Sequence, residues 1–549
     1  MRVRSRFSCL PVLLAVFLVP LDVTAAQSAA QLLEQAEEAL GRRELGEAAS
    51  AFVAAAEASS DVDIAERATQ FTFGVGFDAH AERAVARWID LMPGNPLANE
   101  LLGRLKLRRH AVDDAVQSFL AALGPGEPRR DEVYLALASD LSAEPNARLV
   151  TRVLSRLAAL DPLAAGLQLA LGTAALRSGD IALATGAAQN ALLDDPDWIE
   201  ARLLMARAMV RDGRGDEAFA MIDAISRDDP HPLVQLEQAR MLADAGRFDE
   251  ARETLATLTL LFGERPEIIR TLAFLDLAQG NVEQADARFE VLDDGGSGRF
   301  ESFYYRGQIA GQKGDVEDAR RWFARITAGP YLVPAQLAIA ESLVRSGEGQ
   351  QAVDHLAAFG FNYPAQAYDV LEYRAQILLA LKRPDEALAV YTEALEYKPT
   401  SISVLLARAA LLEQQGQVAA ALRDLERAVA IAPDDPLALN AYGYTLANRT
   451  RHARKAWPYV RRAYELLPAS PPVQDSVGWT LFKLGRTEEA RSHLEEALRH
   501  LPDPEIASHL AEVLWKLGDR AAARNLLSSA AIAHPDSKPV LDTARRLLD

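Results

Sequence analysis

The chain has 549 residues, of which 49% are hydrophobic, 25% charged and 7% aromatic, and its formal net charge is −18. A single compact core rarely grows to this length, so we expect several domains or a repeat array. An acidic surface repels phosphate backbones and anionic lipid headgroups, which argues against a nucleic-acid partner, although a local basic patch stays compatible with the total charge.

The first 26 residues have the pattern of an export signal. Arg2, Arg4 and Arg6 precede a 12-residue apolar stretch over residues 10–21, and small residues follow up to Ala26. Twelve helical residues span about 18 Å, short of the roughly 30 Å of a bilayer's hydrocarbon core. We therefore expect residues 1–26 to be a signal peptide cleaved after Ala26, with an uncleaved anchor as the alternative.

The only cysteine of the chain, Cys9, lies before the apolar stretch. A lipoprotein needs its cysteine just after that stretch, because the mature chain must begin with it. We therefore expect an exported protein that is not a lipoprotein. The mature chain would also lack a thiol for a disulfide or a metal.

Beyond residue 165 one unit recurs along the chain. Its marker is a glycine that precedes a charged or polar residue and stands five residues before an alanine: Gly179, Gly213, Gly246, Gly280, Gly314, Gly347, Gly416, Gly485 and Gly518. Lys382 stands where one more glycine would fall, and Thr450 or Arg451 marks another. From Gly179 to Gly518 the chain advances 339 residues in ten steps, or 33.9 residues per step. This period predicts a repeated helix-turn-helix unit.

Two columns of small residues run in step with these markers. Five residues after them stand Ala184, Ala218, Ala251, Ala285, Ala319, Ala352, Ala387, Ala421, Ala490 and Ala523, with Ala456 one place late. Seven residues before them stand Gly172, Ala206, Ala239, Ala273, Gly307, Ala340, Ala375, Ala409, Gly443, Gly478 and Ala511. Paired helices approach closely only where no bulky side chain separates them, so both columns predict helix pairs packed at short distance.

In these columns the chain resembles the tetratricopeptide-repeat (TPR) family over at least residues 165–549. The resemblance implies an all-α solenoid, a right-handed superhelix of helix-turn-helix repeats. The preceding segment is more degenerate: Ala48 with Phe52 fits one unit and Ala84 with Trp88 another. We expect fourteen or fifteen units in one array. They divide into degenerate repeats over 27–164, repeats over 165–292 and 299–541, and a capping helix over 542–549.

The segment 293–298, Asp-Asp-Gly-Gly-Ser-Gly, interrupts the rhythm. Two interpretations stay open. It is an ordinary loop between repeats, or it is a hinge between two solenoid arms, since glycine-rich segments lack a stiff backbone.

Motifs of catalysis and cofactor binding do not occur in the sequence. It has no phosphate-binding loop ending in Gly-Lys-Ser/Thr, no His-Glu-x-x-His and no Gly-x-Ser-x-Gly. His493 and His500 could share a helix face, but two imidazoles without a carboxylate are a weak metal signal. We expect no catalytic residue, no cofactor and no metal, and therefore no enzyme.

The TPR resemblance implies that positions 2, 5, 9, 12 and 13 of each repeat face a concave groove. The last repeats would thus present aromatic side chains among amide and charged groups, as a protein-binding hot spot requires. The predicted partner-binding residues are Asn440, Tyr444, Asn448, Asp475, Trp479, Phe482, Lys483, Trp515 and Lys516. The alternative is that these aromatic residues pack between helices.

Three segments are similar to a narrower group of envelope TPR proteins of Gram-negative bacteria: residues 439–447, residues 475–479, and residues 502–506 with 513–515. The resemblance is to an outer-membrane TPR lipoprotein that is the adaptor of a carboxyl-terminal processing protease and its cell-wall hydrolase substrates. It implies a periplasmic, non-enzymatic scaffold with protein partners, associated with the outer membrane only through them. The alternative is a structural TPR component of an exopolysaccharide or secretion assembly, and an enzyme with a cryptic site is the third hypothesis.

Overall fold

The computed structural model of the protein describes residues 28–124, 130–144, 146–228, 232–293 and 298–548. Within these ranges every regular element is a helix. Helices α1 to α30 follow one another as fifteen helix-turn-helix units, and α31 follows them. The two helices of a unit pack against each other in all of these units except α7 and α8, which barely touch. The predicted all-α TPR solenoid is confirmed.

The helix bounds are as follows. The first five pairs are α1 (Ala29–Gly41) and α2 (Leu45–Ala58), α3 (Val62–Val75) and α4 (Asp78–Leu91), α5 (Pro96–Arg108) and α6 (Val112–Leu123), α7 (Arg130–Ser142) and α8 (Ala147–Leu160), α9 (Ala165–Ser178) and α10 (Ile181–Ala191). The next five are α11 (Ile199–Arg211) and α12 (Gly215–Asp228), α13 (Pro232–Asp244) and α14 (Phe248–Phe262), α15 (Pro266–Ala278) and α16 (Val282–Val291), α17 (Arg299–Gln312) and α18 (Val316–Ala324), α19 (Leu332–Arg345) and α20 (Gly349–Asn362). After the 3-10 turn η1 (Pro364–Gln366) come α21 (Tyr368–Ala380) and α22 (Pro384–Tyr397), α23 (Ile402–Gln414) and α24 (Val418–Ile431), α25 (Pro436–Arg449) and α26 (Ala453–Leu466), α27 (Pro471–Lys483) and α28 (Thr487–His500), α29 (Pro504–Leu517) and α30 (Arg520–Ala533), then α31 (Lys538–Leu548).

The turns inside the pairs lie where the glycine column predicts them. All nine marker glycines have a left-handed backbone, with φ between 75° and 92°. Lys382 has the same conformation at φ 58°, and so do Arg43 and His110 at φ 60° and 61° in the degenerate N-terminal repeats. Thr450 departs from the column with φ −133°. Glycine is favoured at this position because a left-handed turn brings a β-carbon too close to the backbone.

The second pair corrects one assignment of the sequence analysis. Its turn is at Gly76, with φ 85°, so the alanine five residues later is Ala81. The residue at the place of Phe52 in the first pair is then Val85. The predicted unit built on Ala84 and Trp88 was wrong by three residues, because both are also buried apolar positions of the same helix.

The small columns are places of close helix approach. A methyl group on Gly478 would lie 2.6 Å from Leu494 Cγ and 3.1 Å from the carbonyl oxygen of Ala490. One on Gly307 would lie 2.6 Å from Phe323 Cε1. At these two contacts the helices of a pair interlock only because glycine lacks a side chain, in agreement with the prediction that bulky residues are excluded from the column.

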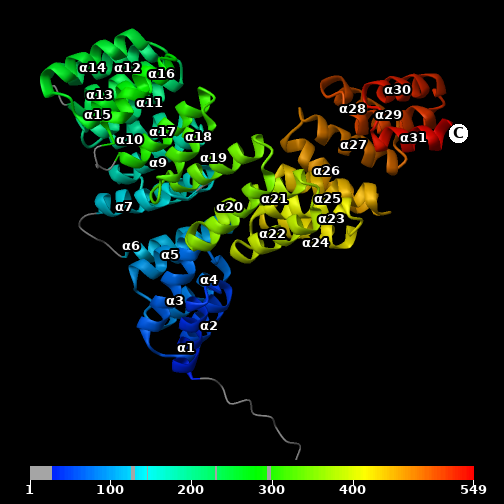
Figure 1. Ribbon diagram of the computed structural model, residues 1–549, viewed down its shortest axis with the longest axis horizontal. Coiled ribbons are helices and arrows are strands. Elements are labelled where there is room, and N and C mark those ends of the chain that lie inside the picture. The colour runs from blue at the N-terminus through cyan, green and yellow to red at the C-terminus, as the bar shows by residue number, and fades with distance from the viewer. Residues whose placement is uncertain (1–27, 125–129, 145, 229–231, 294–297, 549) are drawn as a thin grey trace, which may run out of the picture.

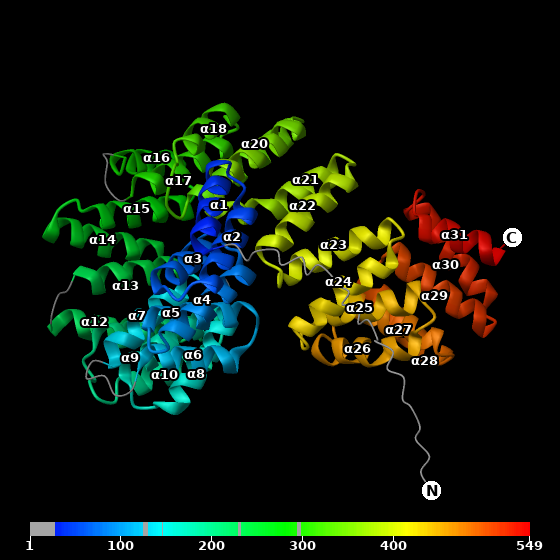
Figure 2. The ribbon, with the colours of Figure 1, turned by 90° about the horizontal axis from the view of Figure 1, so that it is seen from below.

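The array does not run straight. In Figure 1 the chain passes from α1–α6 into α7–α18, returns through α19 and α20 to the side of the first pairs, and continues to α31 at the far end; Figure 2 gives the same path from below. The stacking order is interrupted once, where α6 packs against α8 and α7 packs against α9.

A contact between distant repeats closes this turn of the superhelix. The rings of Phe77 and Tyr397 stack with centroids 4.6 Å apart, and the Arg43 guanidinium lies 4.4 Å from the Phe361 ring centroid. Arg43 Nη1 also donates to the carbonyl oxygen of Phe361 at 3.1 Å. We call this contact the seam; its residues are Arg43, Phe77 and Asp78 on one side and Phe361, Tyr397 and Lys398 on the other.

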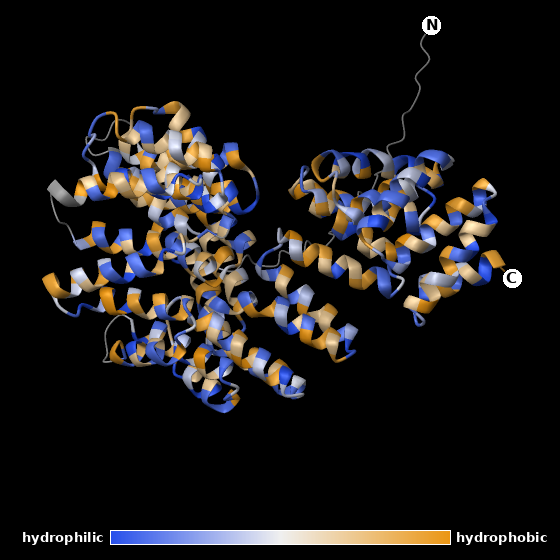
Figure 3. Ribbon diagram, turned by 90° about the horizontal axis from the view of Figure 1, so that it is seen from above, coloured by the Kyte–Doolittle hydropathy of each residue, from blue (hydrophilic) through white to orange (hydrophobic). Residues whose placement is uncertain are grey.

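Several predicted segments lie at the edges of the described ranges. Residues 1–26, the predicted signal peptide, and 294–297, most of the predicted hinge, lie outside them, so both stay predictions. Helices α16 and α17, on the two sides of that segment, pack together. The last helix begins at Lys538, earlier than the predicted 542. Apolar and polar residues alternate along the helices (Figure 3), and among the described residues no helix has the length and hydropathy needed to cross a membrane.

Candidate functional site

A pocket of about 290 Å³ lies on the first helices of four consecutive pairs, α23, α25, α27 and α29. We call it the groove pocket. Three of the predicted partner-binding residues, Asn440, Tyr444 and Asp475, line it. Its apolar wall is made by Leu406, Leu425, Ala441, Pro472, Leu501 and Ile506.

A chain of hydrogen bonds links three of these helices. The Tyr444 hydroxyl donates to Glu505 Oε1, and Asn448 Nδ2 donates to that hydroxyl at 3.0 Å. The Trp479 indole nitrogen in turn donates to Asn448 Oδ1 at 3.1 Å. The predicted residues Tyr444, Asn448 and Trp479 therefore form one connected group, which orients the Tyr444 ring.

Behind this group lies an aromatic stack. Trp479 is only 3% exposed, with the His509 ring 3.9 Å and the Phe482 ring 5.4 Å from its own, both stacked. Lys483 Nζ lies 4.1 Å from the Trp479 ring centroid, and burial lowers the pKa of Lys483. Trp479 thus packs between helices and supports the groove from inside, so its burial disfavours its predicted role as a direct contact for a partner.

Trp515 and Lys516 lie apart from the groove pocket. The Trp515 ring is half-buried and faces the guanidinium groups of Arg520 and Arg524, at 5.1 Å and 5.9 Å. Lys516 is exposed. Of the nine predicted residues, the structure joins Asn440, Tyr444, Asn448, Asp475, Trp479, Phe482 and Lys483 in one site and leaves these two outside it.

The groove pocket is acidic. Its lining includes four carboxylates, Glu413, Asp475, Asp503 and Glu505, and no lysine or arginine is among the described residues that line it. Arg449 reaches Glu413 from outside the lining, with 2.6 Å between Nε and Oε1. Burial and then the negative charges of Glu505, Asp475 and Glu413 raise the pKa of Tyr444.

The sequence analysis did not predict Glu413 and Asp503 as residues of the site. Glu413 stands at position 12 of the repeat that contains Ala409, and Leu406 and Ala410 stand at its positions 5 and 9. All three line the pocket. The groove-position rule would have found Glu413 if it had been applied one repeat earlier, whereas Asp503 lies in the loop that the rule does not cover.

His493 and His500, considered as metal ligands in the sequence analysis, and the nearby His509 all have other partners. His493 packs edge-on against Tyr464, His500 lies 2.8 Å from Glu496, and His509 Nδ1 lies 2.9 Å from Asp475 Oδ1. In the part of the chain that the structure describes, no three His, Cys, Asp or Glu side chains gather as a metal ion would require.

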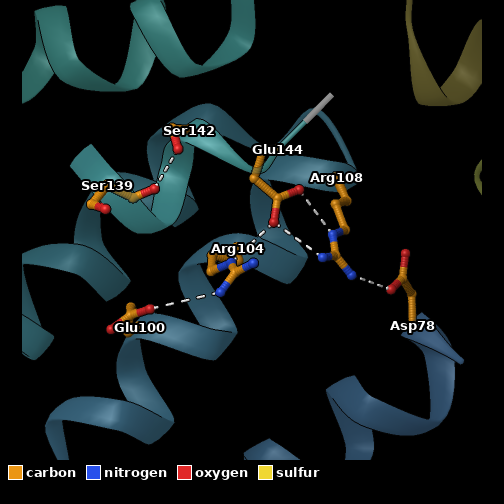
Figure 4. Close-up of polar contacts among 7 residues, drawn as sticks. All are labelled: Asp78, Glu100, Arg104, Arg108, Ser139, Ser142 and Glu144. Atoms are coloured by element: carbon orange, nitrogen blue, oxygen red, sulfur yellow. Dashed lines mark hydrogen bonds and ion pairs between the residues drawn. The ribbon is translucent and has the colours of Figure 1, made fainter. Parts of the chain in front are cut away.

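A second and larger cavity, of about 760 Å³, lies at the seam. Glu144, 3% exposed, receives Arg104 Nε at 3.0 Å and both Nε and Nη2 of Arg108 at 3.0 Å, and Arg108 Nη1 donates to Asp78 Oδ1 at 2.8 Å (Figure 4). Burial alone would raise the pKa of Glu144, but Arg108 and Arg104 hold it below its usual value. Across the cavity, burial lowers the pKa of Lys398. The sequence analysis predicted nothing here.

Comparison with known families agrees with this architecture. Models described as tetratricopeptide repeat match residues 175–241, 378–443 and 481–548, residues 271–332 and 337–402, and residues 232–257. Together these matches cover more than half of the chain.

Individual relatives are more distant. The chain is 31% identical over 206 residues, 38% of its length, to the TPR repeat-containing protein PA4667 of Pseudomonas aeruginosa. It is 24% identical, in an alignment of 486 positions that covers 83% of the chain, to the cellulose synthase operon protein C of Pseudomonas fluorescens. The alignments cover 35% of each relative, so the chain spans about a third of their length. Among solved structures, a TPR protein of Thermus thermophilus matches with 24% identity over 33% of this chain and all of its own, at a TM-score of 0.30.

Proposed function

Because this chain belongs to the tetratricopeptide-repeat family, whose members act as protein-interaction scaffolds, we propose that it is a non-enzymatic scaffold of the bacterial cell envelope that binds partner proteins in its groove. The observation that carries the proposal is the groove pocket. Four consecutive repeats contribute side chains to it, and the Tyr444 hydroxyl is bonded to Asn448 of its own helix and to Glu505 of α29. A preorganised concave site on a rigid array is what recognition of a peptide segment needs.

The proposed location is the periplasm. It rests on the signal-like residues 1–26 and on the similarity of three segments to envelope TPR proteins. The partners implied by that similarity are a carboxyl-terminal processing protease and its cell-wall hydrolase substrates, and we propose them as the first partners to seek.

A second candidate function has its own support. The longest alignment, over 83% of the chain, is to a protein named for a cellulose synthase operon. This favours a structural role in an exopolysaccharide assembly as the alternative, in which the partners would be export components.

The test is crosslinking in cells that export the tagged full chain, followed by affinity purification. Ala410 is exposed and lines the groove pocket, so Ala410→Trp should fill the groove and lose the captured partner. The matched control is Ala521→Trp, on an exposed site of α30. Periplasmic release of the protein with a processing protease captured supports the adaptor; capture of export components alone supports the alternative. Equal capture by both variants would contradict binding in the groove.

A further inference from the structure

The charges of the groove pocket restrict which chemical groups of a partner it can bind. Of the four carboxylates, only Glu413 has an arginine against it, Arg449. Asp503 accepts the backbone N–H groups of Glu505 and Ile506 at 2.7 Å and 3.3 Å, and Glu505 accepts the Tyr444 hydroxyl. The donors to Asp503 and Glu505 are neutral, and Asp475 Oδ1 lies 2.9 Å from His509 Nδ1. Even with one cation beside Glu413 and one imidazole beside Asp475, the four carboxylates leave the pocket with an excess of negative charge.

One acceptor in the pocket has no donor at all. The side-chain oxygen of Asn440, Oδ1, is buried and has no hydrogen-bond partner, and Asn440 lines the pocket. A buried acceptor left unpaired costs about 1–3 kcal/mol. A ligand that supplies N–H donors would remove this cost, whereas a ligand that supplies only acceptors would not.

The apolar wall adds a third requirement. Leu406, Leu425 and Ile506 line the same space as the carboxylates. A volume of about 290 Å³ lies at the small end of ligand sites, so it suits one or two side chains and not a whole folded surface.

We propose that the groove pocket binds an arginine or lysine side chain presented by a segment of the partner protein. The aliphatic stem of such a side chain packs on apolar surface while its head stays charged. Its N–H donors reach Glu505, Asp503 and the Asn440 oxygen, and guanidinium and ammonium groups bring no acceptor of their own. An acidic segment or a free carboxylate is repelled. The proposal rests on the proposed function, because it names what the scaffold recognises.

The test measures binding of fluorescent twelve-residue synthetic peptides to the purified chain by anisotropy. The peptides form three libraries with a fixed central arginine, norleucine or glutamate and otherwise equal composition. Norleucine keeps an aliphatic stem without charge. We expect the arginine library to bind at least about tenfold more tightly than the other two, and more weakly as salt rises.

The matched variants are Asp503→Asn/Glu505→Gln and, on an exposed site of the outer helix α28, Glu488→Gln. Asparagine keeps the helix cap of α29, so the first variant removes charge and leaves the fold. We expect it to remove most of the preference for arginine and Glu488→Gln to preserve it. Equal binding of the three libraries, or a preference that survives Asp503→Asn/Glu505→Gln, would overturn the proposal.

The two proposals fail separately. If Ala410→Trp abolishes partner capture in cells while the arginine preference is absent, the scaffold function stands and the cationic occupant is wrong. If Ala410→Trp leaves capture unchanged while the purified chain prefers arginine, the pocket chemistry stands and the partner binds elsewhere.

Discussion

The seam cavity and the groove pocket are both lined by carboxylates, but the two sites differ in how many of these carboxylates have an arginine partner. At the seam, Glu144 receives two arginines and Asp78 shares one of them. In the groove, four carboxylates have one arginine near them. A polar cavity whose charges are paired within the chain holds two parts of the array together. A cavity whose carboxylates lack a cationic partner within the chain can attract a cationic group of another protein.

The largest loss of stability is expected from a substitution at Arg108, in the seam. Arg108→Ala leaves Asp78 without its arginine and Glu144 with Arg104 alone, so we expect a loss of about 3–5 kcal/mol in the free energy of unfolding. Chemical denaturation followed by circular dichroism measures it. The control is Arg156→Ala, whose exposed pair with Asp113 should contribute less than about 1 kcal/mol. Equal effects of the two substitutions would show that the seam charges are not coupled to folding.

The groove can be distorted through packing instead of charge. In Gly478→Ala the new methyl group meets Leu494 and the carbonyl oxygen of Ala490, so we expect a loss of about 1–3 kcal/mol. Gly186→Ala, inside α10 with open space around it, should stabilise the chain by up to about 1 kcal/mol through helix propensity. The midpoints of thermal unfolding compare the two. If Gly478→Ala leaves the midpoint of thermal unfolding unchanged, this helix pair can move apart to accommodate the methyl group.

Acid should weaken the seam. The folded-state pKa of Glu144 is lowered, so its contribution to stability is present above its unfolded pKa, near 4.3, and is lost as pH falls through the folded value. Burial raises the pKa of Asp78, which opposes part of this loss. We expect Glu144→Gln to be less stable at pH 7 and to lose less stability than the wild type below about pH 4. Parallel curves of denaturation midpoint against pH would contradict the assignment.

The smallest effect is expected at Lys382, in the turn between α21 and α22. A φ of 58° destabilises a residue with a side chain by about 1–2 kcal/mol. Glycine avoids this strain but loses more backbone entropy on folding, which offsets part of the gain. Lys382→Gly should therefore stabilise the chain by less than about 1 kcal/mol, measured as a small rise in Tm. A lower Tm would mean that the lysine side chain makes contacts that outweigh the strain.

Much of the fold could be predicted from the sequence because close packing and left-handed turns restrict residue type. Gly478 and Gly307 stand where a β-carbon would clash, and the marker glycines stand where φ is positive. The glycine pattern did not identify the turns at Arg43 and His110, because a residue other than glycine can adopt the left-handed conformation at a modest cost.

The site was predicted in part for a related reason. Asn440, Tyr444 and Asp475 follow from repeat position, since equivalent positions of consecutive first helices share one surface. Whether an aromatic side chain at such a position faces outward depends on its rotamer and neighbours, which is why Trp515 turned out to face Arg520. The seam had no local signal, because it depends on how the superhelical twist accumulates between residues 43 and 361.

The seam also changes how such an array can come apart. An open solenoid frays repeat by repeat from either end, because each unit touches only its neighbours. Here the Arg43–Phe361 hydrogen bond joins residues 318 positions apart, so the first pairs can detach only by breaking contacts with the middle of the array. Docking of the N-terminal pairs is then a late, high-contact-order step of folding. Once formed, it makes amide-hydrogen exchange in α1–α4 report on the integrity of α20–α22, although the fifteen helices α5 to α19 separate them along the chain.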